Sequence, residues 1–247
     1  MEKKRVIVTG GGASGLMAAI AAAENGAAVT ILEQNEKPGK KICATGNGKC
    51  NFTNIQVPSD ACRSENPGFE QAVLNQFPVE DTVKFVTRLG IYPVNKNVGY
   101  LYPHSGQAAS VAEVLCMEAR NLGVKIKTNQ KGQRVFKEQD IWKVQVEGWI
   151  YEGEAVILSN GSKASAISGS DGSGYELAAA LGHRLIEPLP ALTALKCRNT
   201  GFSGWAGVRT EGRITLLVDG KKVTEGTGEL KLTDSGVPGI PVIQVTR

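Results

Sequence analysis

The sequence has little of the chemistry that disulfide-rich and metal-binding proteins require. Its cysteines are odd in number and form no CxxC pair, so neither a disulfide framework nor a zinc site is predicted. They are Cys43, Cys50, Cys62, Cys116 and Cys197. Only two histidines are present, His104 and His183, and neither lies near a nucleophile-elbow motif. We therefore expect free thiols and no bound metal, and the sequence names no catalytic acid or base.

Long apolar runs and blocks of one charge are also missing. The apolar N-terminal stretch lies between Arg5 and Glu24 and is broken by four glycines, so it does not reach the length that crosses a bilayer. The 28 basic and 24 acidic side chains give a formal net charge of +4 and are mixed along the chain, which does not indicate nucleic-acid binding. These absences predict a soluble, cytoplasmic protein with no membrane or nucleic-acid partner.

The most informative feature that is present is a glycine motif near the N-terminus. Residues 6–33 contain a β-branched run, a glycine-rich turn, an alanine-rich stretch and a second apolar run that ends at Glu33. In this GxGxxG pattern, Gly10 allows a tight turn, Gly12 lets the backbone approach a pyrophosphate, and Gly15 lets the helix pack on the strand. The order strand, glycine turn, helix, strand and acid predicts a dinucleotide-binding unit.

The expected helix after the glycine turn has a chemical reason to bind a diphosphate. Its first N–H groups have no partner within the helix and lie at the positive end of the helix dipole. Glu33 is then expected to accept hydrogen bonds from a ribose 2′-hydroxyl and to disfavour a 2′-phosphate, as in FAD or NAD. The alternative is an ordinary strand-to-helix turn followed by a surface glutamate.

Composition and pattern predict an α/β fold in two parts. A chain of 247 residues with 41% hydrophobic and 21% charged residues reads as globular. Residues 1–189 are expected to form a Rossmann-like domain with a β-hairpin insertion at 133–146 that covers one face of the main sheet. Residues 190–247 are expected to begin a β-rich second domain. Its predicted strands are 193–197, 213–218 and 229–233, with a tight turn at Asp219 and Gly220.

A polar segment that follows the first strand–helix–strand unit shows no regular periodicity. Residues 39–54 read GKKICATGNGKCNFTN and are rich in Gly, Lys, Thr and Asn, which predicts an ordered loop. Helices are expected at 69–76, 79–89, 108–122 and 175–181. Strands are expected at 92–94, 99–102, 124–128 and 155–158, and a Ser/Gly-rich loop at 162–174.

With these features together, the chain resembles the bacterial BaiN/YhiN-type flavoproteins, a family of NAD(P)- and FAD-dependent, aminoacetone-oxidase-like oxidoreductases. The most specific match is the pattern GKK…TGxGxCNxTN in residues 39–54. Further agreement lies in 99–104 followed by Ala108, in 172–175 leading to Gly182 and His183, in 188–192 and in 228–241. Members of this family continue beyond the point where this sequence stops, so we expect a fragment whose β-rich domain is incomplete.

The resemblance implies FAD bound in an extended pose over the first domain. It places the pyrophosphate at Gly10, Gly12, Ser14 and Gly15, and the adenosine ribose at Glu33. It places the phosphate charge beside Lys40 and Lys41, which follow the ribose strand. It assigns the path toward the flavin ring to Thr45, Gly46, Asn47, Gly48, Cys50 and Asn51. It assigns adenine contacts to the backbone of Arg134 and Val135, and a flavin contact to Gly161, within SNGS where many relatives carry ATGG.

The resulting hypothesis is an FAD-dependent oxidoreductase in which a small organic substrate or NAD(P)H delivers a hydride to the flavin. No second strand-GxGxxG-helix unit is visible for NAD(P)H, so oxygen is a further candidate oxidant. Two alternatives stay open: an NAD-dependent dehydrogenase, which leaves residues 39–54 unexplained, and a noncatalytic nucleotide-binding fragment of a flavoprotein. The sequence does not identify the substrate or the oligomeric state.

Overall fold

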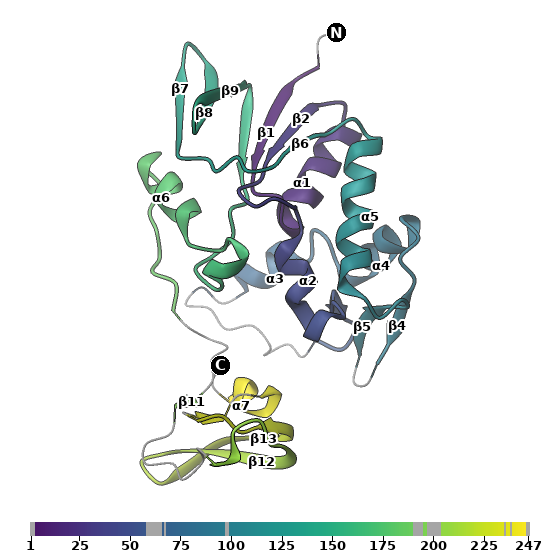
Figure 1. Ribbon diagram of the computed structural model, residues 1–247, viewed down its shortest axis with the longest axis vertical. Coiled ribbons are helices and arrows are strands. Elements are labelled where there is room, and N and C mark those ends of the chain that lie inside the picture. The colour runs from purple at the N-terminus through teal and green to yellow at the C-terminus, as the bar shows by residue number, and fades with distance from the viewer. Residues whose placement is uncertain are drawn as a thin grey trace. The chain divides into compact units, whose positions relative to one another are not determined.

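The computed structural model describes residues 3–57, 66, 68–96, 99–189, 195–196, 204–234, 236–237 and 239–245 (Figure 1). The chain divides into two compact units, Met1–Ile186 and Glu187–Arg247. No helix among the described residues combines the length and the apolar character that a membrane span requires.

The first unit is built on a parallel sheet of four strands in the order β10-β1-β2-β6. The strands are β1 (Arg5–Thr9), β2 (Ala28–Leu32), β6 (Lys125–Lys127) and β10 (Ala155–Leu158). In the register, Val8 lies between Ile31 of β2 and Ile157 of β10. Because β1 is central and parallel to both neighbours, the predicted Rossmann-like α/β arrangement is confirmed.

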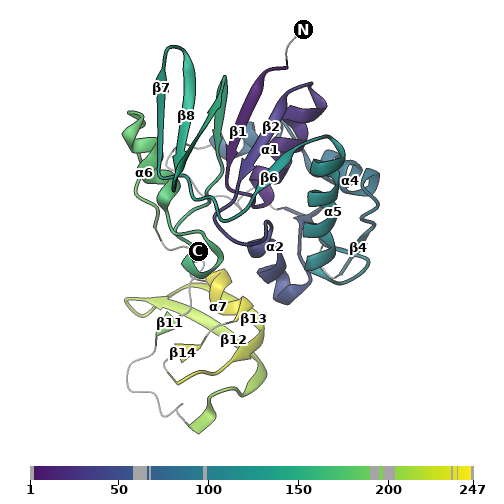
Figure 2. The same cartoon turned by 45° about the horizontal axis from the view of Figure 1, so that its top comes forward.

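The two faces of the sheet are covered by different structures (Figure 2). Strand β1 supplies side chains to the hydrophobic clusters on both faces. Val6 and Val8 pack with the helices α1 (Ala13–Glu24) and α5 (Ala108–Asn121), whereas Ile7 packs in a second cluster with residues of β7, β8 and α6 (Ser173–Ala180). This alternation follows from the two-residue period of a strand. A strand buried on both faces explains why residues 6–8 are apolar without a break.

The predicted hairpin insertion is confirmed and contains one strand more than expected. Its strands are β7 (Arg134–Glu138), β8 (Ile141–Val146) and β9 (Trp149–Gly153), all antiparallel. The turn lies at Gln139 and Asp140, whose φ values of 46° and 64° match the left-handed conformation of a tight hairpin turn. Val135, Val144 and Val146 are buried, so the hairpin covers one face of the sheet as predicted.

The prediction of a loop over residues 39–54 was wrong at its start. Residues of this segment form the helix α2 (Lys40–Ala44) and a 3-10 turn (Thr45–Gly48), followed by the short strand β3 (Thr53–Asn54). A helix of five residues is shorter than the window over which a helical period is visible. The helix buries a single side chain, Ile42, so the sequence has no amphipathic pattern that would predict it.

The remaining elements of this unit lie near their expected positions. They are α3 (Phe69–Leu74), α4 (Val79–Arg88), β4 (Pro93–Asn95) and β5 (Tyr100–Pro103). The segment 162–174, expected as a loop, contains a 3-10 turn at Ala166–Ser168, and its last two residues belong to α6, which begins two residues earlier than predicted. Strands β3, β5 and β4 form a small antiparallel sheet separate from the main one.

The second unit is dominated by one long hairpin of β12 (Arg209–Val218) and β13 (Lys221–Lys231). The turn at Asp219 and Gly220 is where the sequence predicts it. The first part of β13 was missed because Gly226 and Gly228 weaken the strand pattern. These glycines face α7 (Ile240–Val245), also not predicted: a Cβ atom on Gly226 would lie 3.0 Å from the backbone oxygen of Pro241. Of the predicted strand 193–197, only β11 (Leu195–Lys196), which pairs with β14 (Gly236–Val237), lies within the described residues.

The packing of α1 on its own preceding turn generates a prediction for stability. A Cβ atom on Gly15 would overlap the carbonyl oxygen of Gly10, whereas a Cβ atom on Gly12 meets no atom within 4 Å. We expect Gly15→Ala to lower the free energy of unfolding by about 1–3 kcal/mol, since the backbone must shift to admit the methyl group. Urea unfolding followed by circular dichroism measures this loss. Gly12→Ala is the matched control, and equal stability of the two variants would contradict the packing argument.

Candidate functional site

A cavity in the first unit lies where the strands β1, β2 and β10 end. Its volume is about 650 Å³, a size typical of small-molecule sites. In an open parallel sheet, ligands bind at the carboxyl ends of the strands, and here the turns that follow all three strands line one space. The position of the cavity is therefore a consequence of the sheet topology.

Glu33 directly follows β2 and lines the cavity. Its side chain is buried, with the residue 5% exposed, and hydrogen bonds fix the orientation of its carboxylate. Its Oε2 accepts a hydrogen bond of 2.6 Å from the backbone N–H of Gly11. Its Oε1 accepts bonds from Asn35, at 2.8 Å from the backbone N–H and 2.6 Å from the side-chain amide. A carboxylate offers about four acceptor positions, so one position on Oε2 is left for a hydroxyl donor.

Neither the backbone conformation nor the packing of the protein requires a glycine at position 12. Its φ of −76° is open to any residue, and a Cβ atom there would meet nothing within 4 Å. Gly10 differs, because its φ is 97° and a Cβ atom would overlap the carbonyl of Ser159. The space above Gly12 faces the cavity, so the absence of a side chain there benefits a ligand rather than the fold.

The amino end of α1 adds an electrostatic reason for an anion to bind at the same place. No side chain caps its first turn, whose N-cap residue is Gly12. Lys40 and Lys41 also line the cavity, and among the described residues their hydrogen-bond partners are neutral: Oδ1 of Asn35 at 3.4 Å and Oγ of Ser170 at 3.3 Å. Two cations without a carboxylate partner and an uncapped helix end favour a phosphate group.

Most of the residues singled out from the sequence are brought together by this cavity. It is lined by Gly10, Gly12, Ser14, Glu33, Lys40, Lys41, Thr45, Cys50, Asn51 and Gly161. The cavity lining does not include Gly15, Gly46, Asn47, Gly48, Arg134 and Val135. Val135 is buried in the hairpin cluster, and the guanidinium of Arg134 lies 4.8 Å from the centre of the Phe136 ring. Backbone contacts from these residues stay predictions.

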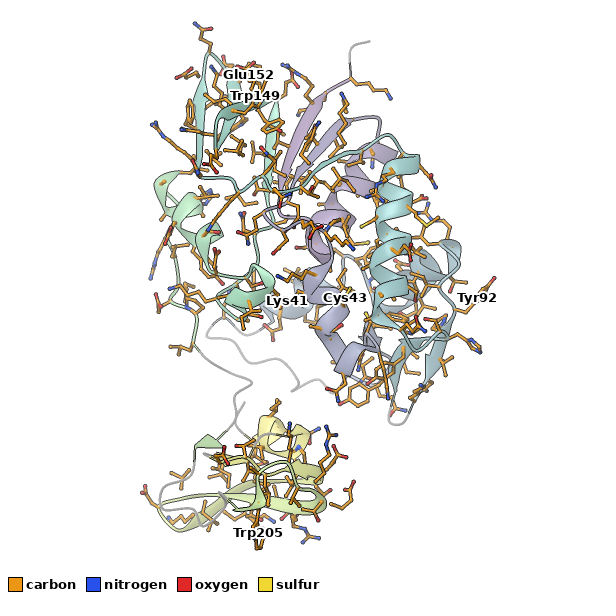
Figure 3. All side chains as sticks on the ribbon, viewed as in Figure 1. Lys41, Cys43, Tyr92, Trp149, Glu152 and Trp205 are labelled. Atoms are coloured by element: carbon orange, nitrogen blue, oxygen red, sulfur yellow. The ribbon has the colours of Figure 1, made fainter. Side chains whose placement is uncertain are left out.

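Cys50 forms part of the cavity wall, while Cys43 lies exposed on α2, next but one to Lys41 (Figure 3). Burial raises the pKa of the Cys50 thiol above its ordinary value, although a hydrogen bond with Thr45 opposes the shift. A neutral thiol is a weak nucleophile. The structure thus favours Cys50 as a packed wall residue, held with an unusual φ of 57°.

Sequence reasoning missed several residues that line the cavity. On the polar side these are Gln34, Asn35, Gln130, Lys131, Ser168, Gly169 and Ser170, and on the apolar side Met17, Phe52, Phe77, Phe85, Val86, Val111 and Leu115. The richness in Ser and Gly of 162–174 was a signal for the polar group. The apolar group follows ordinary core periodicity, so nothing in the sequence separates it from the core. Among the described residues, no cluster of His, Cys, Asp and Glu could hold a metal ion.

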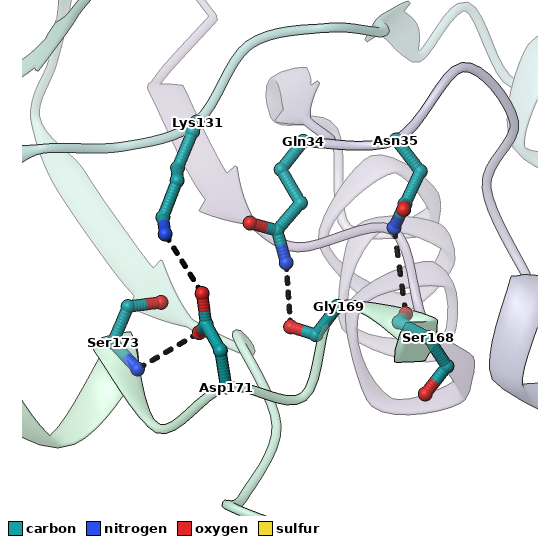
Figure 4. Close-up of polar contacts among 7 residues, drawn as sticks. All are labelled: Gln34, Asn35, Lys131, Ser168, Gly169, Asp171 and Ser173. Atoms are coloured by element: carbon teal, nitrogen blue, oxygen red, sulfur yellow. Dashed lines mark hydrogen bonds and ion pairs between the residues drawn. The ribbon is translucent and has the colours of Figure 1, made fainter. Parts of the chain in front are cut away.

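An ion pair ties the loop after β10 to the segment after β6 (Figure 4). Nζ of Lys131 lies 2.7 Å from Oδ2 of Asp171, and Oδ1 of Asp171 accepts a 3.0 Å bond from the backbone N–H of Ser173. The hydrogen bond from Lys131 lowers the pKa of the Asp171 carboxyl to about 2. The pair is therefore ionised over the whole physiological pH range.

This shift predicts how the ion pair affects stability at acid pH. Because the carboxyl pKa falls from 3.8 to about 2 on folding, the pair stabilises the fold above about pH 4 and its contribution is lost as pH falls toward 2. Both side chains are partly exposed, so the effect is at most about 1 kcal/mol. The difference in unfolding free energy between the parent protein and Asp171→Asn should shrink between about pH 5 and pH 3. A constant difference in urea titrations would contradict the ion pair.

Comparison with known proteins agrees with this geometry. Residues 4–239 match the family described as HI0933-like protein Rossmann domain. The chain is 44% identical over 245 residues to a 3-dehydro-bile acid delta(4,6)-reductase of Clostridium scindens, and 30% identical over 247 residues to a ribosomal RNA dihydrouridine synthase of Haemophilus influenzae. Each match covers 98% of this chain and 60% of the relative, so the chain spans about three fifths of their length.

A solved structure shows the same fold at low sequence identity. The 3-ketosteroid-delta4-(5alpha)-dehydrogenase of Rhodococcus jostii RHA1 superimposes with a TM-score of 0.54 at 19% identity, over 74% of this chain and 55% of that one. The glycine turn, the buried acid after β2 and the parallel sheet thus occur together with a family match over nearly the whole chain. The chain belongs to the HI0933-like Rossmann family, the BaiN/YhiN-type flavoproteins.

Proposed function

We propose that this chain is the FAD-binding part of a flavin-dependent oxidoreductase. The observation that carries the proposal is the cavity wall at Gly12, which leaves open space directly at the uncapped end of α1. The buried carboxylate of Glu33 lines the same cavity and keeps one acceptor position free. A diphosphate joined to an unphosphorylated ribose satisfies both features, and FAD contains that group.

Each site residue predicted from the sequence has a task in this proposal, including the six that lie outside the cavity lining. Gly10, Gly12, Ser14 and Gly15 hold the pyrophosphate at α1, and Lys40 and Lys41 offset its charge. Glu33 accepts a ribose hydroxyl, while Arg134 and Val135 contact the adenine. Thr45, Gly46, Asn47, Gly48, Cys50, Asn51 and Gly161 hold the flavin part. In this proposal residues 1–189 are the FAD domain and residues 190–247 are part of a β-rich substrate domain.

FAD supplies the hydride transfer, and the chain supplies orientation and a shielded site. Two relatives, named as a reductase and a dihydrouridine synthase, act on substrates that gain hydrogen. We therefore propose that an organic substrate accepts the hydride and that NAD(P)H donates it. The relative with 44% identity is named for a bile acid, which supports a small-molecule substrate, whereas relatives with 30% and 26% identity are named for ribosomal RNA. The cytoplasmic location stays a prediction.

Binding of FAD tests the proposal directly. We expect the purified chain mixed with FAD and freed of excess ligand to retain a flavin absorbance spectrum. Gly12→Ala should reduce FAD affinity by at least about tenfold, because the methyl group occupies the space required by the pyrophosphate. Gly204→Ala, which also meets no atom within 4 Å, is the matched control and should bind FAD as the parent does. Tight binding of NAD with no binding of FAD would support the NAD-dependent dehydrogenase instead.

The identity of the electron donor is a separate prediction. Under anaerobic conditions, NADH or NADPH should bleach the absorbance of the bound flavin, since a transferred hydride reduces the ring. Stopped-flow absorbance measures the rate of this reduction, and dithionite serves as a positive control for complete reduction. Bleaching by dithionite but by neither nucleotide would contradict the assignment of NAD(P)H as donor. It would leave the binding of FAD unaffected.

A further inference from the structure

A compact segment after β10, residues 165–171, borders the polar side of the cavity, and we call it the strap. Its two ends are joined by backbone hydrogen bonds between Ser165 and Ser170, at 3.3 Å and 2.9 Å. The 3-10 turn Ala166–Ser168 lies between them. The strap therefore has backbone hydrogen bonds of its own, which restrict its conformation in addition to its contacts with other parts of the chain.

One side of the strap is fastened to the residues that follow β2. The side-chain amide of Gln34 donates to the carbonyl oxygen of Gly169, and the amide of Asn35 approaches the carbonyl oxygen of Ser168 at 3.4 Å (Figure 4). Gly169 has a φ of 91°, and a Cβ atom there would lie 2.8 Å from the Asn35 amide nitrogen. The close approach thus depends on a glycine at this position.

The other side of the strap is fastened by two lysines. The Lys131–Asp171 ion pair joins it to the segment after β6, and Lys41 of α2 approaches the hydroxyl of Ser170 at 3.3 Å. Three separate parts of the chain, following β2, following β6 and in α2, therefore converge on seven residues. Of these fastenings only the Lys131–Asp171 pair joins two charges at hydrogen-bond distance.

The strap borders the sector of the cavity that contains Glu33. Ser168, Gly169 and Ser170 line the cavity together with Gln34, Asn35 and Lys131. Asn35 connects the two structures directly, because the same amide nitrogen bonds to Oε1 of Glu33 at 2.6 Å and approaches the strap at Ser168. A ligand that bonds to Glu33 therefore lies beside the strap rather than beside the apolar end of the cavity.

We propose that the strap is the outer wall of the adenosine subsite and that the Lys131–Asp171 ion pair holds it in place. These two residues position the wall and take no part in the redox chemistry. Asp171 also neutralises the charge of Lys131, whereas Lys40 and Lys41, which line the same cavity, have neutral hydrogen-bond partners among the described residues. The inference rests on the proposed binding of FAD. It deepens that proposal by assigning the retention of one half of the cofactor to particular residues.

The experiment compares three ligands that differ in the part they present to the cavity. FAD contains adenosine and flavin joined by a diphosphate. ADP contains the adenosine and the diphosphate without the flavin, and FMN contains the flavin and one phosphate without the adenosine. Isothermal titration calorimetry on the full chain gives the dissociation constant of each ligand for the parent and for Asp171→Asn. We expect the variant to bind FAD and ADP about three- to fivefold more weakly, as expected for loss of a partly exposed ion pair, and to bind FMN with unchanged affinity.

A matched control comes from the β7–β8 turn. Lys137 and Asp140 also form an ion pair, at 2.9 Å, outside the cavity, so Asp140→Asn removes the same charge from the same kind of pair. We expect it to leave all three dissociation constants unchanged. Lys131→Met removes the other end of the strap's ion pair and should reproduce the pattern of Asp171→Asn, which keeps the test decisive if one variant folds poorly.

The outcomes separate this inference from the proposed function. Weaker binding of FMN by the same factor as FAD, or unchanged binding of FAD and ADP in both variants, would overturn the role of the strap. Binding of ADP but not of FAD by the parent would refute the proposed function, while loss of ADP affinity in the variants would still support the strap. A parent protein that binds none of the three ligands would overturn both.

Discussion

The close approach of three backbone segments at the first glycine turn is the constraint on which the site depends. The N–H of Gly10 bonds to the carbonyl of Leu32 at 2.7 Å, so the turn is attached to the end of β2. On its other side Gly10 lies against the carbonyl of Ser159, which follows β10, and Gly15 lies against the carbonyl of Gly10 itself. A side chain at Gly10 would push the turn away from the end of β10, and a side chain at Gly15 would push α1 away from the turn. Because the strands end together, α1 begins at the edge of the cavity and its unpaired N–H groups face it.

The buried carboxylate of Glu33 and the buried hydroxyl of Thr9 at this edge have hydrogen-bond partners within the protein. Glu33 is held by Gly11 and Asn35, and the buried hydroxyl of Thr9 donates to Oδ1 of Asn160 at 2.7 Å. A buried carboxylate without such bonds would be costly. Satisfying it with backbone donors fixes its orientation, so a ribose hydroxyl would meet a prearranged acceptor.

The two faces of the central sheet divide the remaining tasks. One face packs on α1, which directly follows the glycine turn, and on α5. The other face is covered by the hairpin of β7, β8 and β9 and by Leu177 of α6, and α6 directly follows the strap. The position of the strap therefore depends on packing on the hairpin side, while the uncapped helix end depends on packing on the helical side. The cavity lies where these two layers meet.

The amino-acid sequence by itself determined the local parts of this protein. The order of strand, glycine turn, helix and acid over residues 6–33 predicts β1, α1, β2 and a carboxylate directly after β2, because each depends on neighbours in the chain. The ribose contact of Glu33 stays a prediction. The hairpin turn at Gln139 and Asp140 is equally local. Short elements were missed or misplaced: α2 is too short to show a helical period, and the glycines in β13 conceal a strand that needs them to accept α7.

Only the tertiary structure decided which distant residues share the cavity. Asn35, Lys131 and the strap are separated by up to 135 positions along the chain, as in the bond between Gln34 and Gly169, and no periodicity links them. The tertiary structure also showed that Gly46, Asn47 and Gly48, which belong to the most distinctive sequence motif, do not line the cavity. The physical reason is that a period reports which face of an element is buried, whereas the partner across a cavity is set by how the layers pack.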